Sequence, residues 1–102
     1  PLLHNPALQA AAESHARDLA ETGRVSHTGS DGSDLSDRVA RSGYDACLAA
    51  ENIAQGQTTA RAVLDDWLAS DGHRANLLNP QVTQFGVARD RETWVLVLAR
   101  PC

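Results

Sequence analysis

The sequence has no long apolar run, no basic block and no lysine. No stretch of its 102 residues approaches the roughly 18 apolar residues that a membrane-spanning helix needs, so none is expected here. All nine positive charges are arginine, and the net charge is −4. This balance lacks the electrostatic footprint of a nucleic-acid-binding protein or of a polybasic membrane patch.

What remains is ordinary for a soluble globular chain. Apolar residues make up 42% and charged residues 22% of the sequence. The length suits one domain, residues 1–102, which we expect to be a monomer. No charged segment followed by an apolar one is present, so no signal peptide is visible, and a processed chain would look the same.

Cysteine is also scarce. Cys47 and Cys102 are the only two, they do not form a CxxC pair, and two distant cysteines cannot make a closed zinc site alone. One long-range disulfide fits them, because it would tie down the last residue, and it would imply an oxidising compartment. Two unpaired thiols in a cytosolic protein are the alternative.

Helical signals dominate the first three quarters of the chain. Residues 5–23 have Asn5 as a cap, Pro6 in the first turn and Gly23 as a stop. Their inner stripe comprises Leu8, Ala12, His15, Ala16 and Leu19. Residues 33–44 predict a short helix with Leu35 and Val39 inward and Gly43 as its left-handed stop.

A third helix is predicted over residues 58–72, capped by Thr58 or Thr59 and broken by Gly72. Its apolar stripe comprises Val63, Leu64, Trp67 and Leu68. Residues 73–80 predict one or two further helical turns that Pro80 stops.

The remaining segments indicate strands. Residues 47–56 are too short for a good helix, and residues 83–90 and 93–100 predict a terminal hairpin. Both faces of the last strand are apolar, which is typical of a strand covered on both sides. The pattern predicts an α+β fold with a small, mainly antiparallel sheet and helices on both faces.

The four histidines differ in setting. His4 lies near the N-terminus and is expected to be inert, and His15 is expected to be a hydrogen-bonded core residue. His27 lies in a loop of Gly, Ser and Asp, and His73 follows Gly72 at the start of a short helix. Element ends of this kind are common places for functional sites.

Glu51 lies among small apolar residues, so it needs partners for its charge. A set of His27, Glu51 and His73 could ligate zinc with one position open to water, or could form a metal-free cluster. Ser70, His73 and Glu51 could also be a nucleophile, base and orienting acid. We disfavour that interpretation, because no strained G-x-S-x-G elbow is present.

Several motifs together resemble one family. In chain order, SHTGSDG, RVARSGY, AENIAQG, VLDDWLASDGHRANLL and FGV before a Trp-bearing strand resemble the CAP superfamily, also called SCP/TAPS. It is named for cysteine-rich secretory proteins, antigen 5 and plant pathogenesis-related 1 proteins. The resemblance is to its bacterial branch in particular, and it covers nearly the whole chain.

The resemblance implies a three-layer α-β-α sandwich, secreted to an extracellular or periplasmic location, with a cleft on one side. The family cleft carries two His and two Glu. His27, Glu51 and His73 match three of these, and Ser70 stands where the second Glu would be. Tyr44 and Trp67 also match family positions, where packing is the expected role.

Three functions are compatible with these residues. The first is a binding module whose cleft holds zinc or another divalent cation and takes a small-molecule, lipid-like or cell-envelope ligand. The second is a metal-dependent hydrolase or protease-like enzyme, and the third is a structural domain with a relic cleft. The absence of an HExxH motif, and of a second acid in the matched motifs, favours binding over turnover.

Overall fold

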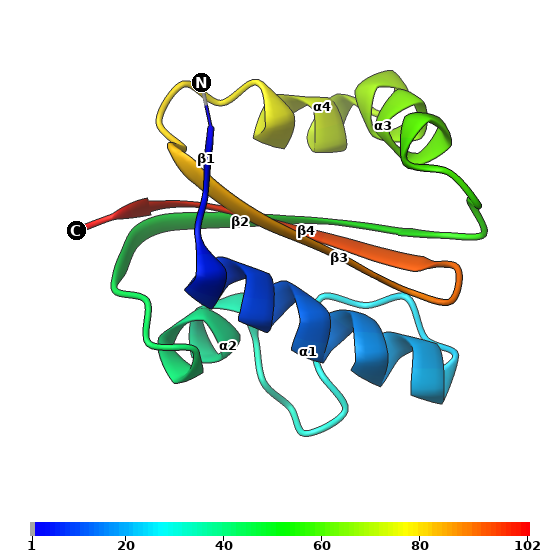
Figure 1. The fold of residues 1–102 in the computed structure, drawn as a ribbon, viewed down its shortest axis with the longest axis horizontal. Coiled ribbons are helices and arrows are strands. Elements are labelled where there is room, and N and C mark those ends of the chain that lie inside the picture. The colour runs from blue at the N-terminus through cyan, green and yellow to red at the C-terminus, as the bar shows by residue number, and fades with distance from the viewer. Residues whose placement is uncertain (1) are drawn as a thin grey trace.

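A computed structural model describes residues 2–102 as three layers, with α1 and α2 on one face of a central sheet and α3 and α4 on the other (Figure 1). The elements are β1 (Leu3–His4), α1 (Pro6–Thr22), α2 (Leu35–Arg41), β2 (Ala46–Gln55), α3 (Ala60–Ala69), α4 (Asp71–Leu77), β3 (Gln84–Asp90) and β4 (Thr93–Pro101). This arrangement confirms the predicted α+β class and the α-β-α sandwich.

The sheet has the order β1-β3-β4-β2. β4 pairs antiparallel with both β2 and β3, whereas β1 pairs parallel with β3, so the sheet is mixed and mainly antiparallel. β1 was not predicted, because two residues carry no periodicity to read. His4 belongs to it, exposed at the sheet edge opposite β2.

Local signals place α1 as predicted. The Asn5 side chain accepts hydrogen bonds from the backbone N–H groups of Ala7 and Leu8, and Gly23 ends the helix at φ 70°. The buried stripe includes His15 among small and apolar residues. The lack of a side chain at Gly86 lets the start of the helix approach β3 closely, because a Cβ there would overlap backbone atoms of Leu8 and Gln9.

α2 is shorter than the predicted segment. It begins after Asp34, which forms a reciprocal capping box with Asp37, and it ends before Gly43 at φ 90°. Val39 is buried as expected and Leu35 packs against the core. Arg38, one residue earlier than Val39, is buried as well.

α3 departs from the prediction in two ways. Thr59 is the cap, and Val63 and Trp67 are buried, but Leu64 and Leu68 are 42% and 37% exposed, so the predicted stripe was too wide. The helix also stops at Ala69 rather than at Gly72, because Ser70 is extended and Gly72 lies inside α4.

β4 is covered on both sides, as its sequence predicted. One face packs against α1 through Val95, Val97 and Ala99, and the other packs against α3 through Trp94, Leu96 and Leu98. This strand is therefore the centre of both apolar cores.

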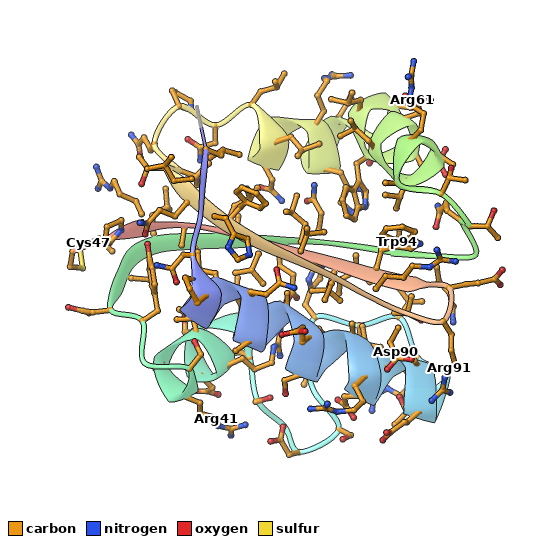
Figure 2. The ribbon with its side chains drawn as sticks, viewed as in Figure 1. Arg41, Cys47, Arg61, Asp90, Arg91 and Trp94 are labelled. Carbon is orange, nitrogen blue, oxygen red and sulfur yellow. A yellow bond between two sulfur atoms is a disulfide. The ribbon has the colours of Figure 1, made fainter. Side chains whose placement is uncertain are left out.

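The predicted disulfide is present between Cys47 and Cys102, whose Cα atoms lie 4.7 Å apart. Figure 2 shows its yellow sulfur bond beside Cys47 at one end of the sheet. The bridge joins the end of β4 to β2, and the Cys102 N–H also donates to the Asp45 carbonyl. Across residues 2–102 no helix is long and apolar enough to cross a bilayer.

Candidate functional site

The site is organised by β2, the edge strand whose successive side chains point to opposite faces of the sheet. Glu51 faces the layer of α1 and α2, where it meets Arg38. Asn52 faces the opposite layer, where its amide donates to the backbone carbonyl of His73. One strand thus positions polar groups toward both helical layers.

Glu51 is held inside by a cation and an imidazole. Nη2 of Arg38 lies 3.0 Å from each carboxylate oxygen, and Nδ1 of His27 lies 2.8 Å from Oε1. The Glu51 side chain is only 2% exposed, and that of Arg38 5%. A buried carboxylate is stable when its charge is paired and its oxygens are hydrogen-bonded, and both conditions are met here.

The contact with Glu51 fixes the orientation of His27. A carboxylate oxygen accepts hydrogen bonds, so Nδ1 of His27 carries the hydrogen that it donates to Glu51. The ring is 63% exposed. Its other nitrogen, Nε2, is therefore the one available as a base or as a metal ligand, in the way that a carboxylate behind a histidine orients many metal sites.

His15 lies in the core, as predicted, and it supports the loop that carries His27. Its Nε2 donates a hydrogen bond of 2.7 Å to the carbonyl of Ser26, the residue before His27. The same nitrogen is 3.9 Å from Oε1 of Glu51. Burial lowers the pKa of His15 below its ordinary value, against the opposing pull of the Glu51 charge.

The position of His73 depends on hydrogen bonds donated by the Asn52 and Asn76 side chains rather than on the Glu51 carboxylate. It lies in the first turn of α4, half-buried. Asn76 donates to the Asn52 side chain at 2.9 Å and to the Glu51 carbonyl at 3.5 Å, so α4 is fixed against the edge of β2. The His73 side chain makes no hydrogen bond with Glu51 or His27 in the described chain.

The predicted metal ligands are therefore only partly assembled. His27 and Glu51 touch, whereas His73 comes from the other helical layer. Within residues 2–102, no group of three or more His, Cys, Asp or Glu side chains is placed to hold a metal ion. Among the described residues, the Glu51 carboxylate contacts one of the two imidazoles and not the other.

Ser70 joins α3 to α4 as the cap residue of both helices, and its hydroxyl makes no capping hydrogen bond. No hydrogen bond links it to His73 among the described residues. The serine, histidine and glutamate arrangement that we disfavoured from sequence is thus not formed as a hydrogen-bonded triad.

Sequence reasoning missed Arg38, the main partner of Glu51. One signal was available: a carboxylate in an apolar segment needs a cation, and Arg38 follows Leu35 by three residues on the inner face of its helix. His15 was assigned to the core but not to the support of the His27 loop.

Comparison with known proteins gives consistent matches. The model of the cysteine-rich secretory protein family, CAP, matches residues 1–96. The chain is 37% identical over 78 residues to "Uncharacterized membrane protein YlbC" of Bacillus subtilis, which covers 76% of this chain and 22% of that protein.

Solved structures agree. An extracellular protein containing a SCP domain from Bacillus anthracis superposes with a TM-score of 0.94 at 33% identity, covering 97% of this chain and 33% of that one. An outer surface protein from Borrelia burgdorferi shares the fold, with a TM-score of 0.88 at 24% identity, covering 99% of this chain and 78% of that one. The chain thus spans a third or less of the length of these two Bacillus proteins.

Proposed function

Because the chain belongs to the CAP family of cysteine-rich secretory proteins, we propose that it is an extracytoplasmic binding module whose cleft is centred on His27. Glu51 orients this histidine, and α4, which carries His73, is hydrogen-bonded to the same strand through Asn52 and Asn76. The ligand would be a small molecule, a lipid-like molecule or a component of the cell envelope.

One observation carries this proposal: the 2.8 Å hydrogen bond from His27 to a buried, arginine-bound Glu51. Burying an ion pair to hold an exposed imidazole in place costs desolvation free energy that an apolar pair would avoid. Such an arrangement is common where an imidazole has to meet a ligand in a fixed orientation.

Two further observations support a location outside the cytoplasm. The disulfide between Cys47 and Cys102 is typical of oxidising compartments. The Bacillus anthracis protein is described as extracellular.

The same donors suit a divalent cation such as zinc. Neutral imidazole nitrogens of His27 and His73 would be its ligands, with Glu51 accepting the hydrogen of the His27 ring from behind. A bound cation would supply a Lewis-acid centre with open positions, which an anionic or hydroxylated ligand could occupy.

Calorimetric titration with zinc chloride tests this proposal. The wild-type protein should show a saturable site that His27→Ala and His73→Ala each abolish, whereas His4→Ala, at the opposite sheet edge, should leave zinc affinity unchanged. Affinity should fall as the pH drops below about 6, because protons compete for imidazole nitrogens. No saturable site, or one that survives both substitutions, would overturn the metal-holding cleft.

Turnover distinguishes a hydrolase from a binding module. The zinc-loaded protein should leave casein and p-nitrophenyl acetate unchanged. Zinc-dependent product formation that His27→Ala removes would instead establish the hydrolase. A chain that binds no zinc and forms no product would fit the structural domain with a relic cleft.

A further inference from the structure

A groove of about 310 Å³ lies between α1 and the outer edge of β3. β1 covers only the start of that edge, because it pairs with Gln84 and Phe85 before the chain turns into α1. The groove is lined from α1 by Gln9, Glu13, Ala16 and Arg17 and from β3 by residues 87–90. His27, Glu51 and His73 do not line it, so it is distinct from the cleft proposed above.

The backbone of β3 is open along this groove. The Val87 N–H points away from β4, because it donates to Oε1 of Gln9 at 2.9 Å in an exposed setting. Outward and inward positions alternate along an antiparallel strand, so the Val87 C=O and the Arg89 N–H point outward as well. Within residues 2–102, no side chain and no further strand bonds either group. Both residues are exposed, and Ala88 between them lines the groove although its side chain packs in the core, so the backbone forms this wall.

The opposite edge of the sheet does not offer the same groups. On β2, the carbonyl of Glu51 accepts from the Asn76 side chain at 3.5 Å, and the carbonyl of Ile53 accepts from the Trp67 indole at 3.1 Å. An unpaired edge is a template for another strand, and side-chain donors on its carbonyls compete with such pairing. The open edge beside α1 is therefore where this sheet can accept a further strand.

β1 shows how an added strand would lie. It runs parallel to β3, and the Asn5 N–H donates to the Phe85 carbonyl at 2.9 Å. The Asn5 carbonyl then accepts from the Gln9 N–H in α1, and the Gln9 side chain supplies the oxygen that bonds Val87. Beyond this point the path of β1 along β3 is vacant in the described chain.

One residue placed on that path would find both of its hydrogen bonds prepared. A residue parallel to β3 and opposite Ala88 would donate its N–H to the Val87 carbonyl and accept from the Arg89 N–H, in the slanted pattern of a parallel pair. Strand addition of this kind is a common way in which proteins bind extended peptides.

Two free charges on α1 lie beside the same path. Glu13 and Arg17 are four residues apart on the helix, both are exposed, and neither has an ion-pair partner among the described side chains. The other charged groups of the lining are engaged: Asp90 lies 3.2 Å from Arg91, and the Arg89 guanidinium stacks on a tryptophan ring. Glu13 and Arg17 are therefore the charges available to a ligand.

The order of these charges fixes a direction. α1 and β3 run the same way along the groove, because Gln9 bonds Val87 at one end, whereas Arg91, just after β3, donates to the Ala20 carbonyl near the end of α1 (Figure 2). Glu13 therefore lies nearer the start of the vacant path, and Arg17 lies nearer its end. A peptide parallel to β3 would direct its N-terminal ammonium group toward the carboxylate and its C-terminal carboxylate toward the guanidinium.

The spacing also sets a length. Four residues of helix rise about 6 Å, and two steps of a strand cover about 6.6 Å. The termini of a three-residue peptide therefore match the separation of Glu13 and Arg17 along the groove. The groove volume lies at the low end of the range of about 300–1,000 Å³ that small-molecule sites occupy.

From these relationships we infer that the groove between α1 and the free edge of β3 binds a short peptide with ionised termini, about three residues long, as a strand parallel to β3. Its middle residue lies opposite Ala88. Recognition is through the backbone and the two terminal charges, so the site tolerates different small side chains.

NMR titration of the nitrogen-15-labelled protein with trialanine tests the inference. The Arg89 N–H resonance should shift saturably. Ala-(N-methyl)Ala-Ala lacks the N–H that would donate to Val87 and should bind at least about tenfold more weakly, whereas Ala-Ala-(N-methyl)Ala, whose methyl group points away from β3, should bind like trialanine. Trialanine with an acetylated N-terminus and an amidated C-terminus should also bind about tenfold more weakly, because both ion pairs are lost.

Variants of α1 test the orientation. Glu13→Gln and Arg17→Gln should each weaken the binding of trialanine about threefold, which is the value of one exposed ion pair. The blocked peptide should bind both variants as it binds the wild type. Glu21→Gln, on the same helix but outside the groove, and Arg61→Gln, on α3, are the matched controls and should change nothing.

Four outcomes would overturn the site. They are no saturable shift of the Arg89 N–H, equal affinity for free and blocked trialanine, equal weakening by the two N-methyl groups, and concentration-dependent shifts without peptide, which would assign the edge to a second copy of the chain. The inference does not depend on the zinc cleft, because His27→Ala should abolish zinc binding and leave the binding of trialanine unchanged.

Discussion

Arg38 and Glu51 form a buried ion pair in which Nη2 of the arginine lies 3.0 Å from both carboxylate oxygens. The pair joins α2 to the edge strand β2. Because Glu51 also accepts a hydrogen bond from His27, the same arginine indirectly fixes an exposed imidazole in the candidate cleft. Stability and the geometry of the site therefore depend on one contact.

Arg38→Met should lower the free energy of unfolding by about 3–5 kcal/mol, because it leaves a buried carboxylate without its cation. Urea unfolding at pH 7 measures the loss. The double variant Arg38→Met/Glu51→Leu should recover most of it, since no unpaired charge remains.

Arg61→Met is the surface control. Arg61 points outward from α3 (Figure 2) and lies 3.7 Å from Asp65. Its substitution should lower the free energy of unfolding by less than about 1 kcal/mol. Equal losses for Arg38→Met and Arg61→Met would contradict the importance of burial.

His15 should make stability depend on pH. Burial lowers its pKa in the folded state below the ordinary value, so folding favours the neutral ring. The stabilisation is fully present above about pH 6.5, the unfolded value, and is lost as the pH falls through the lower folded value. Glu51, Arg38 and Asp18 are the charged groups that act on this ring.

The comparison of wild type with His15→Gln isolates that contribution. The variant should be less stable by about 1–3 kcal/mol at pH 7.5, because the hydrogen bond to Ser26 is disturbed. Between pH 7 and pH 5 it should lose less stability than the wild type does. Asp18 and Asp31 do not interfere, because hydrogen bonds from Ser30 and Ser33 lower the pKa of each carboxyl below its ordinary acidic value. Parallel pH curves for the two proteins would exclude His15 as the titrating group.

Gly86→Ala should be strongly destabilising. A Cβ at this position in β3 would overlap backbone atoms of Leu8 and Gln9 in α1, which cannot move without lifting the helix from the sheet. We expect a loss of about 3 kcal/mol or more, above the usual range for overpacking, in thermal or urea unfolding. Gly72→Ala is the matched control, because a Cβ at this position would meet nothing within 4 Å. Since Gly72 lies inside α4, alanine there should raise the free energy of unfolding by up to about 1 kcal/mol. Similar effects of the two substitutions would refute the close approach of α1.

The disulfide between Cys47 and Cys102 should contribute about 4 kcal/mol in the chain-entropy model, since it closes a loop with a sequence separation of 55 residues. Intact mass should rise by two hydrogens only after reduction. Cys47→Ser/Cys102→Ser should unfold at lower urea concentration, and a reductant should then have no further effect. Two thiols that alkylate freely in the native, unreduced protein would rule the bridge out.

Ser70→Glu tests the match to the family cleft, which has an acidic residue at this position. With zinc, the extra carboxylate should tighten binding and raise the thermal midpoint more than in wild type, by an amount that grows with zinc concentration. In chelator, a second carboxylate near Glu51 should lower stability through repulsion between like charges. The loss of the serine itself should matter little, because its hydroxyl caps neither helix. Behaviour identical to wild type in both conditions would mean that residue 70 points away from the cleft.

The sequence alone determined the features that depend on near neighbours in the chain. Asn5 and Gly23 bound α1, Thr59 caps α3, and the doubly apolar pattern of residues 94–99 placed β4 between two layers. Capping, left-handed glycine and strand alternation are local effects of backbone geometry, so a few residues are enough to express them.

Only the tertiary structure decided which groups meet across elements. The sequence showed that the Glu51 carboxylate needed partners for its charge. That Arg38 rather than His73 is its partner follows from the pleat of β2, which turns Glu51 toward α2 and Asn52 toward α4. The exposure of Leu64 and Leu68 likewise depends on how much of α3 the sheet can cover. Such contacts join residues far apart in the chain, and their geometry is set by the packing of whole layers rather than by the propensity of any one segment.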